Sequence, residues 1–260
     1  MKIADQRAEG FVSARLGSGL VSTYPGELPQ TLDEAYGIQD EAIRAWPDAV
    51  KGWKVGRITG DYEQQYGCDR LVGPVFEPFC HDASADSIDM PAFAKGFTAV
   101  EGEVTAVIAK DFPADKTTVT SEEALDYIES LHLGVEVASS PFPGINDFGP
   151  LVTISDFGNN RGLILGAEIP GWKEMRLEDW QFVTEINDDE VGRATPEGLP
   201  GGPVESVRYL LENTARRGLP LKKGMMVLTG AVTGVHEAKI GDSSTISLLG
   251  NSISLQLTEA

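Results

Sequence analysis

Three glutamates are the residues of this chain that are best suited by type and spacing to do chemistry. Glu101 and Glu103 lie in the β-branched run Ala99–Ile108, and Glu136 lies in the later run Leu133–Val137. Successive side chains of a strand point to opposite faces, so Glu101 and Glu103 share a face. Carboxylates converging from two strands would form an all-oxygen site, which suits Mg²⁺ or Mn²⁺ better than zinc. Acidic residues with this period are also typical of the wet face of a half-exposed strand, and both interpretations stay open here.

A lysine between glycines is the second candidate. Lys54 stands in the segment Lys51-Gly-Trp-Lys-Val-Gly56. Glycine has no side chain, so the backbone can approach a ligand closely at such a place. A lysine held there supplies positive charge and, when desolvated, can act as an acid or base. The alternative is that Trp53 and Val55 face the core while Lys54 faces water, as most lysines do.

Two further segments place polar groups next to turn-forming residues. Asp156, Asn159 and Asn160 lie in a cluster of turn formers before an apolar run. They could contact a substrate or order metal-bound water, or they could simply form Asx turns. Thr229 and Gly230 lie where another strand opens into a glycine-flanked loop. The Thr229 hydroxyl and the free backbone N–H groups of that loop could hold a carboxylate.

The composition excludes several classes of partner. The 260 residues carry a formal net charge of −19 at pH 7. Nucleic acids and anionic membrane surfaces require a basic footprint, so neither is an expected partner. No apolar run approaches the length of a membrane span and the N-terminus lacks signal-peptide regions, so a cytoplasmic location is expected. The chain also lacks GxGxxG, P-loop and GxSxG motifs, which disfavours nucleotide-dependent and serine-hydrolase chemistry.

The cysteines and histidines offer no competing metal site. The two cysteines, Cys68 and Cys80, have no metal-like spacing and are expected to be reduced thiols. The three histidines, His81, His132 and His236, lie far apart in the sequence. We expect them to be structural or surface residues rather than ligands.

Helix signals concentrate in the first part of the chain. The spacing of apolar residues predicts a helix over residues 3–16. Thr31 and Glu34 have capping-box spacing and predict the start of a second helix. We expect residues 1–50 to form a small helical part and residues 51–260 to form a β-rich catalytic domain.

Strands dominate the remainder. Ser121 is expected to cap a short helix carrying Leu125, Ile128 and Leu131, and residues 203–217 to form another helix. The segments expected as strands include a hairpin of 180–186 with 191–195, a short strand at 225–229 and a closing pair within 245–257. Strands and helices do not alternate regularly, so the predicted class is α+β with a mixed β-rich core rather than a doubly wound sheet.

In their order along the chain, these segments resemble the 2-hydroxypentadienoate (2-oxopent-4-enoate) hydratase and oxalocrotonate decarboxylase family. That family is a branch of the fumarylacetoacetate hydrolase superfamily. The matching pieces are Tyr36-Gly-Ile-Gln39, Gly52-Trp-Lys-Val-Gly56, Val100-Glu-Gly-Glu103, Gly134-Val-Glu136, Asp156 through Leu163-Ile-Leu-Gly166, the 202–218 helix, Val227-Leu-Thr-Gly230 and Gly241-Asp242. The resemblance covers most of the chain and rests on the ordered set rather than on any single piece.

The resemblance implies a fumarylacetoacetate hydrolase-like mixed β-roll core and a divalent cation, Mg²⁺ or Mn²⁺, held by Glu101, Glu103 and Glu136. It implies that Lys54 is the active-site lysine of the family. The expected substrate is a small 2-oxo acid that binds the metal through its carboxylate and 2-oxo oxygens. Beside these residues, we expect Asp156 to be catalytic. Residues expected to bind substrate are Thr229, Gly230 and Asn159.

The sequence departs from the usual family pattern in three places. The family's Glu-Pro-Glu is Glu-Gly-Glu at 101–103, which should leave both carboxylates able to bind metal. Its Asp-Ser-Arg after the third glutamate is Ala138-Ser-Ser140, which changes the surroundings of the site and bears on the choice of substrate. Its Leu-Thr-Gly-Ser is Leu-Thr-Gly-Ala231, which removes one hydroxyl near the expected carboxylate site.

The expected function is a metal-dependent hydratase of a small 2-oxo-alkenoate of the 2-hydroxypenta-2,4-dienoate type in aromatic-compound catabolism. An alternative is the sister decarboxylase of 4-oxalocrotonate, a dicarboxylate whose far end needs a further cation such as Arg57 or Arg161. Acylpyruvate hydrolysis has less support, because we find no His/Glu pair to activate water. A different class is a non-catalytic partner homologue in a complex with a decarboxylase, because fold resemblance does not secure function. The expected assembly is a homo-oligomer.

Overall fold

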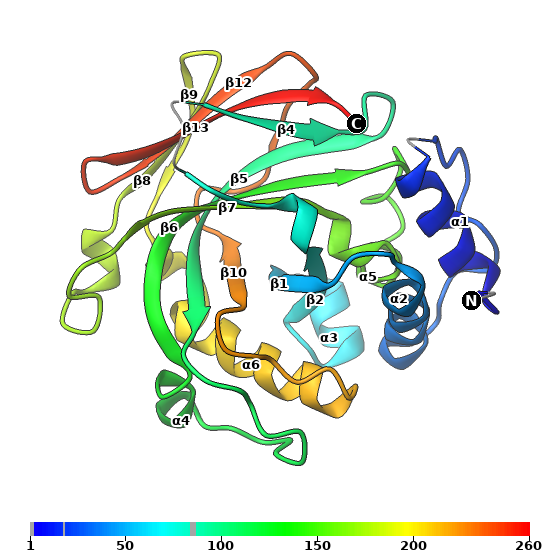
Figure 1. Cartoon of the computed structure of the whole chain (residues 1–260), viewed down its shortest axis with the longest axis horizontal. Helices are drawn as coiled ribbons and strands as arrows, with labels where there is room; N and C mark the ends of the chain where they lie inside the picture. The colour runs from blue at the N-terminus through cyan, green and yellow to red at the C-terminus, as the bar shows by residue number, and fades with distance from the viewer. Residues whose placement is uncertain (1–2, 18, 84–86) are drawn as a thin grey trace.

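Two curved β-sheets make up most of the fold (Figure 1). The structure is a computed structural model that describes residues 3–17, 19–83 and 87–260. The larger sheet has eight strands in the order β2-β1-β10-β5-β6-β7-β3, and β11 also pairs with β5. Its strands are β1 (Val50–Arg57), β2 (Arg70–Phe76), β3 (Cys80–Asp82), β5 (Phe97–Ile108), β6 (Ile128–Ser140), β7 (Asn160–Glu168), β10 (Met226–Ala231) and β11 (His236–Glu237).

The smaller sheet has five strands in the order β4-β13-β12-β8-β9. These strands are β4 (Ile88–Ala92), β8 (Phe182–Ile186), β9 (Asp189–Ala194), β12 (Ser243–Leu248) and β13 (Asn251–Glu259). The predicted hairpin is confirmed as β8 and β9, and the closing pair as β12 and β13. Each sheet contains antiparallel strand pairs together with parallel pairing, for example β1 with β10 in the larger sheet and β4 with β13 in the smaller. The predicted α+β class with a mixed β core is therefore confirmed.

The helices lie at the margins of the sheets. They are α1 (Gln6–Leu16), α2 (Leu32–Ala45), α3 (Asp61–Tyr66), α4 (Ser121–Leu125), α5 (Pro150–Ser155) and α6 (Gly202–Arg216). Short 3₁₀ turns occupy Glu77–Phe79, Phe157–Asn159, Leu177–Asp179 and Pro196–Gly198. α1 and α2 lie side by side next to α5, and α6 lies beneath β10 (Figure 1). The predicted helices at the start of the chain and at 203–217 are therefore confirmed within a few residues at each end.

The helix expected after Ser121 is shorter than predicted. Thr120 is its N-cap, because its hydroxyl accepts a hydrogen bond from the backbone N–H of Glu123, whose side chain bonds back to the N–H of Thr120. The prediction that Ser121 is the cap is wrong by one residue. Ile128 and Leu131 belong to β6 and not to the helix. Their helical spacing is overridden because β6 pairs along almost its whole length with β5.

Two polar side chains of α2 attach this helix to the β-rich part. The side chain of Gln39 donates hydrogen bonds to the carbonyls of Val72 (2.9 Å) and Ile154 (2.8 Å). The Tyr36 hydroxyl accepts a hydrogen bond from the Val72 N–H at 3.1 Å. The predicted boundary at residue 50 coincides with the first residue of β1. The division into two domains stays a prediction.

Gly73 of β2 marks a close backbone contact that predicts a large effect on stability. A Cβ at this position would lie 2.0 Å from the Phe157 carbonyl oxygen. Gly73→Ala should lower the free energy of unfolding by about 3 kcal/mol or more, at the upper end for overpacking. Gly37 on α2 is the matched control, because no described atom lies within 4 Å of its Cβ position. Gly37→Ala should raise the free energy of unfolding by about 0.5–1 kcal/mol. Urea unfolding measures both, and equal responses would contradict the close contact.

Candidate active site

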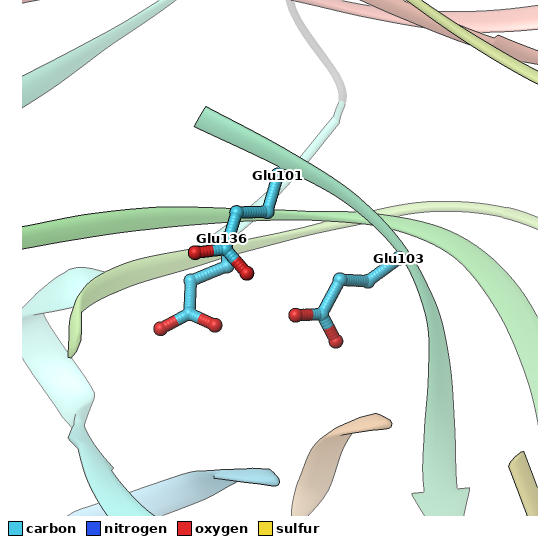
Figure 2. Close-up of side chains that lie close together, drawn as sticks. All are labelled: Glu101, Glu103 and Glu136. Carbon is cyan, nitrogen blue, oxygen red and sulfur yellow. The ribbon is translucent and has the colours of Figure 1, made fainter. Parts of the chain in front are cut away.

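Glu101, Glu103 and Glu136 converge in the larger sheet and are called the carboxylate triad below. Glu101 and Glu103 share one face of β5, and Glu136 lies opposite Glu101 on the antiparallel neighbour β6 (Figure 2). One carboxylate oxygen from each residue lies within 4.8 Å of the other two. The three side chains are buried, with at most 5% of any residue exposed. The interpretation of these glutamates as a wet strand face is therefore wrong.

Hydrogen bonds fix the triad from two sides. The backbone N–H of Gly230 donates to Glu103 Oε2 at 2.7 Å. The side-chain amide of Asn160 donates to Glu136 Oε1 at 2.8 Å. The second oxygen of Glu136 is buried and has no hydrogen-bond partner among the described residues. A buried carboxylate oxygen without a partner is costly, so this atom points to a ligand that the triad accommodates.

The chemistry of the triad fits a hard divalent cation. Burial, followed by the charge of Glu136, raises the pKa of Glu101 to about 8. Burial and the two neighbouring carboxylates likewise raise the pKa of Glu103 well above its usual range. Three crowded carboxylates are thus costly as bare anions, and a cation bound between them would remove that cost. Because every donor is a carboxylate oxygen, the set suits Mg²⁺ or Mn²⁺.

The raised pKa values predict how the stability of the metal-free protein depends on pH. In the unfolded chain these carboxyls lose their protons near pH 4.5, whereas folded Glu101 does so near 8. The folded state therefore binds more protons between these values, and stability must fall as pH rises through this interval. The slope should be about 1.4 kcal/mol per pH unit for each such group. Urea unfolding in EDTA at several pH values measures it, with Glu101→Gln as the variant that should flatten the curve. Constant stability across the interval would contradict the prediction.

Lys54 on β1 lies beside the triad. Its Nζ is 3.5 Å from Glu136 Oε1, and the residue is buried. Burial lowers the pKa of Lys54, but the triad carboxylates, led by Glu136, outweigh this effect and raise it overall. Gly52 allows β1 to approach β10, since a Cβ there would lie 2.8 Å from the Met226 carbonyl oxygen. The interpretation that Lys54 faces water is therefore wrong.

A cavity of about 640 Å³ opens onto these residues. Its lining includes Glu101, Lys54, Asn159, Arg57 and Ala231. The side-chain oxygen of Asn159 is buried and unpartnered among the described residues. A ligand in the cavity would therefore meet a carboxylate, an ammonium group and an amide. Asn159 is the predicted substrate-binding residue that the structure places in the cavity.

Asp156 lies outside the cavity lining. It is fully buried, and its carboxylate forms an ion pair with Arg15 of α1. Its Oδ2 also accepts a hydrogen bond from the Ser140 hydroxyl at 2.6 Å. Both carboxylate oxygens of Asp156 are therefore engaged within the protein, by Arg15 and Ser140. A catalytic role for Asp156 stays a prediction.

Thr229 and Gly230 also contact the protein rather than the cavity. The Thr229 hydroxyl donates to the Val104 carbonyl oxygen at 2.7 Å. The Gly230 N–H is directed at Glu103. In this structure they fix β10 and a triad residue against β5. The expected contact of these two residues with a substrate carboxylate stays a prediction.

Arg15 is absent from the sequence-based site and Ser140 enters it only as a departure from the family pattern, yet both contact Asp156. One signal could have indicated Arg15. It continues the buried face of α1 formed by Ala8, Phe11 and Val12 at helical spacing. A charged residue on an apolar helix face needs a partner, although the sequence does not show which one.

The family departures lie at different distances from the chemistry. Gly102, between two triad residues, faces the smaller sheet, since its Cβ position is 3.0 Å from Ile246 and Thr184. This orientation leaves both flanking carboxylates on the triad face. Ala231 lines the cavity, so its missing hydroxyl affects the ligand space directly. The prediction of reduced thiols is confirmed, because Cys68 and Cys80 are both free.

Similarity to known proteins identifies the family. The family model described as fumarylacetoacetate (FAA) hydrolase C-terminal matches residues 78–257. The chain belongs to the fumarylacetoacetate hydrolase family. It is 25% identical over 230 residues to 2-keto-4-pentenoate hydratase 1 of Dechloromonas aromatica (strain RCB), covering 84% of this chain and 83% of that protein.

Solved structures of this fumarylacetoacetate hydrolase family confirm the fold. The 4-oxalocrotonate decarboxylase from Pseudomonas putida G7, complexed with magnesium and adipate, superposes with a TM-score of 0.79 at 22% identity, covering 96% of this chain and 95% of that one. Fumarylpyruvate hydrolase from Pseudomonas aeruginosa, in complex with Mn²⁺ and pyruvate, gives a TM-score of 0.58 at 15% identity, with 82% and 91% covered. The resemblance inferred from the ordered motifs is thus confirmed, and the similarities support an enzyme. No helix in the described part of the chain is long and apolar enough to cross a membrane.

Proposed function

We propose that this member of the fumarylacetoacetate hydrolase family is a hydratase that uses Mg²⁺ or Mn²⁺ to add water to a small 2-oxo-alkenoate. The observation that carries the proposal is the buried carboxylate triad beside Lys54 at the cavity. Similarity to a 2-keto-4-pentenoate hydratase supports the reaction. The magnesium and manganese in two structural neighbours support the choice of metal. The expected setting is the catabolism of aromatic compounds.

The triad, Lys54 and Asn159 each have a separate role in the proposed reaction. The triad would hold the cation, which when bound supplies a Lewis acid for the negative charge that develops on the substrate's 2-oxo oxygen. Lys54 presents an ammonium group to an anionic substrate in a buried place, where such an interaction is stronger than in water. It also offsets the negative charge of the protein at the point where an anion must enter. Asn159 offers its amide to the ligand, and water adds at the distal double bond of the ketonised 2-oxo-alkenoate.

A specific observation keeps decarboxylation of 4-oxalocrotonate as the second candidate. Arg57 lines the cavity and forms no ion pair with any described residue. Arg161 does not line it, because its guanidinium lies over the rings of Phe79 and Phe93. Of the two arginines considered from the sequence, the position of Arg57 therefore supports it as the residue that would bind a second substrate carboxylate. In that reaction the electrons left by departing CO₂ would move to the same 2-oxo group.

One assay separates these functions. The protein is stripped with EDTA, supplied with Mg²⁺ or Mn²⁺, and assayed for loss of 2-hydroxypentadienoate absorbance beside CO₂ release from 4-oxalocrotonate. Metal-dependent formation of 4-hydroxy-2-oxopentanoate is the expected result. CO₂ release instead would establish the decarboxylase. If neither substrate is converted, the proposed hydratase activity is wrong. A protein that binds the metal but converts neither substrate would act on another 2-oxo acid. A protein that does not bind the metal would be the non-catalytic partner.

Assembly and location form part of the same proposal. We expect a homo-oligomer in the cytoplasm, with a small 2-oxo acid as ligand and a sister decarboxylase as a candidate partner in a complex. Light scattering of the purified protein tests the homo-oligomer. A monomer at micromolar concentration would contradict that expectation.

A further inference from the structure

Arg15 near the end of α1 is a buried cation that reaches into the β-rich part of the chain. Only 2% of its side chain is exposed. Its Nε donates to Asp156 Oδ1, and its Nη2 donates to Asp156 Oδ2 at 2.9 Å. The guanidinium also lies over the rings of Phe93 and Phe157, at 5.7 Å and 5.3 Å from their centroids. A fork of this kind fixes a carboxylate in both position and orientation.

The guanidinium of Arg15 also donates to two backbone carbonyls, one at the start of β7 and one near the end of β6. Nη1 donates to the Asn160 carbonyl oxygen at 2.8 Å, where β7 begins. Nη2 donates to the Ser139 carbonyl oxygen at 3.1 Å, near the end of β6. Arg15 thus joins the end of the strand that carries Glu136 to both ends of the segment between Asp156 and Asn160.

That segment is strained. Phe157, Gly158 and Asn159 all have left-handed φ values, 53°, 66° and 64°. Non-glycine residues adopt such values at a cost, and they keep them only where the surrounding structure holds them. Gly158 lies against Lys54, because its Cβ position is 3.1 Å from Lys54 Cδ.

The turn delivers two amides to the metal centre. Asn159 reaches the cavity with an unpartnered oxygen, and Asn160 donates to Glu136. Any relaxation of the turn would therefore move both amides relative to the triad and Lys54. The geometry points to Arg15 as a positioning residue that holds this turn, and with it Asn160 and Glu136, in the arrangement that binds the metal. This inference rests on the metal site of the proposed function.

If Arg15 is replaced by an uncharged residue, position 140 on β6 is a place from which another side chain could supply a positive charge to Asp156. Glu136, Ala138 and Ser140 alternate along β6 and so share one face of the strand. The Ser140 hydroxyl already touches Asp156 Oδ2. A longer cationic side chain at 140 would be directed at the same carboxylate. The guanidinium that now pairs with this carboxylate comes from α1.

The test measures Mn²⁺ affinity by calorimetry on folded, metal-free protein. Arg15→Met should weaken Mn²⁺ binding at least about tenfold, the range for residues that orient metal ligands. Arg15→Lys, which keeps the charge but not the fork, should weaken it less and stays available if the methionine variant does not fold. Arg7→Met is the matched control, because Arg7 also lies on α1 but pairs with Asp5 and Glu34 at the surface. It should lower thermal stability without changing Mn²⁺ affinity.

A second substitution that restores Mn²⁺ affinity distinguishes a positioning role of Arg15 from a general effect on stability. The double variant Arg15→Met with Ser140→Arg should recover most of the lost Mn²⁺ affinity. Folded Arg15→Met or Arg15→Lys protein that binds Mn²⁺ with parental affinity would overturn the inference. A parental protein that binds no Mn²⁺ would overturn it together with the proposed metal site. Parental protein that binds Mn²⁺ but converts neither substrate would overturn the proposed reaction alone, while the affinities of the variants still decide the role of Arg15.

Discussion

Glu103→Gln should abolish metal-dependent turnover and weaken Mn²⁺ binding at least about a hundredfold, which corresponds to about 2.7 kcal/mol. The substitution preserves size, and the amide oxygen can still accept the hydrogen bond that Gly230 donates to Glu103. What it removes is one negative charge from a set of three buried carboxylates. The loss of binding would therefore report on charge rather than on a disturbed fold.

The same substitution should make the metal-free protein more stable. Burial and the neighbouring carboxylates raise the pKa of Glu103 in the folded state, so at neutral pH this group opposes folding. Removing it should raise the free energy of unfolding by about 1 kcal/mol or more, because a neutral amide has neither the cost of a buried charge nor that of taking up a proton at neutral pH. A variant that is more stable without metal and no longer stabilised by added metal would be difficult to explain by misfolding.

Thermal unfolding with and without MnCl₂, together with steady-state kinetics, measures both effects. Glu129→Gln is the matched control, because Glu129 lies on β6 like Glu136 but faces solvent. It should leave metal-induced stabilisation and turnover at the parental level. Parental turnover in Glu103→Gln would contradict the site.

Lys54→Met should lower kcat/KM at least about tenfold, equivalent to about 1.4 kcal/mol of transition-state stabilisation. Methionine keeps much of the length and loses the ammonium group. Lys54 lies at 3.5 Å from Glu136 and lines the cavity, but as a cation it is no metal ligand. Mn²⁺ affinity should therefore be retained or increased, since the triad loses a competing positive charge.

Kinetics in saturating Mn²⁺ beside a calorimetric titration separate the two effects. Lys51→Met is the control, because Lys51 lies on the same strand β1 with its side chain exposed. It should behave as the parental protein. Undiminished kcat/KM in folded Lys54→Met would remove Lys54 from the mechanism, and a parallel loss of Mn²⁺ affinity would show that it supports the triad instead.

The core of the site could be predicted from local pattern. The period of two in a strand places Glu101 and Glu103 on one face, whatever the partner strand is. The glycines around Lys54 indicate close backbone approach, which the pairing of β1 with β10 requires. The register that sets Glu101 opposite Glu136 depends on the pairing of two strands and cannot be read from either alone.

Residues that act across long sequence separations could not be predicted. Arg15 and Asp156 are 141 positions apart, and neither has a local motif that names its partner. The sequence alone therefore presents Asp156 as a candidate for catalysis and does not show that it is buried against an arginine. The same holds for Thr229 and Gly230, because the sequence shows their donors but not that Val104 and Glu103 accept these hydrogen bonds.

The central claim is that the carboxylate triad binds a divalent cation at which a 2-oxo acid is held. Anomalous diffraction from crystals grown with Mn²⁺ and oxalate, a stable mimic of a 2-oxo acid, tests it most directly. The expected result is one manganese peak per chain, bounded by Glu101, Glu103 and Glu136, with oxalate bound to it on the side of Lys54. A triad without a manganese peak in crystals that hold Mn²⁺ elsewhere would contradict the account.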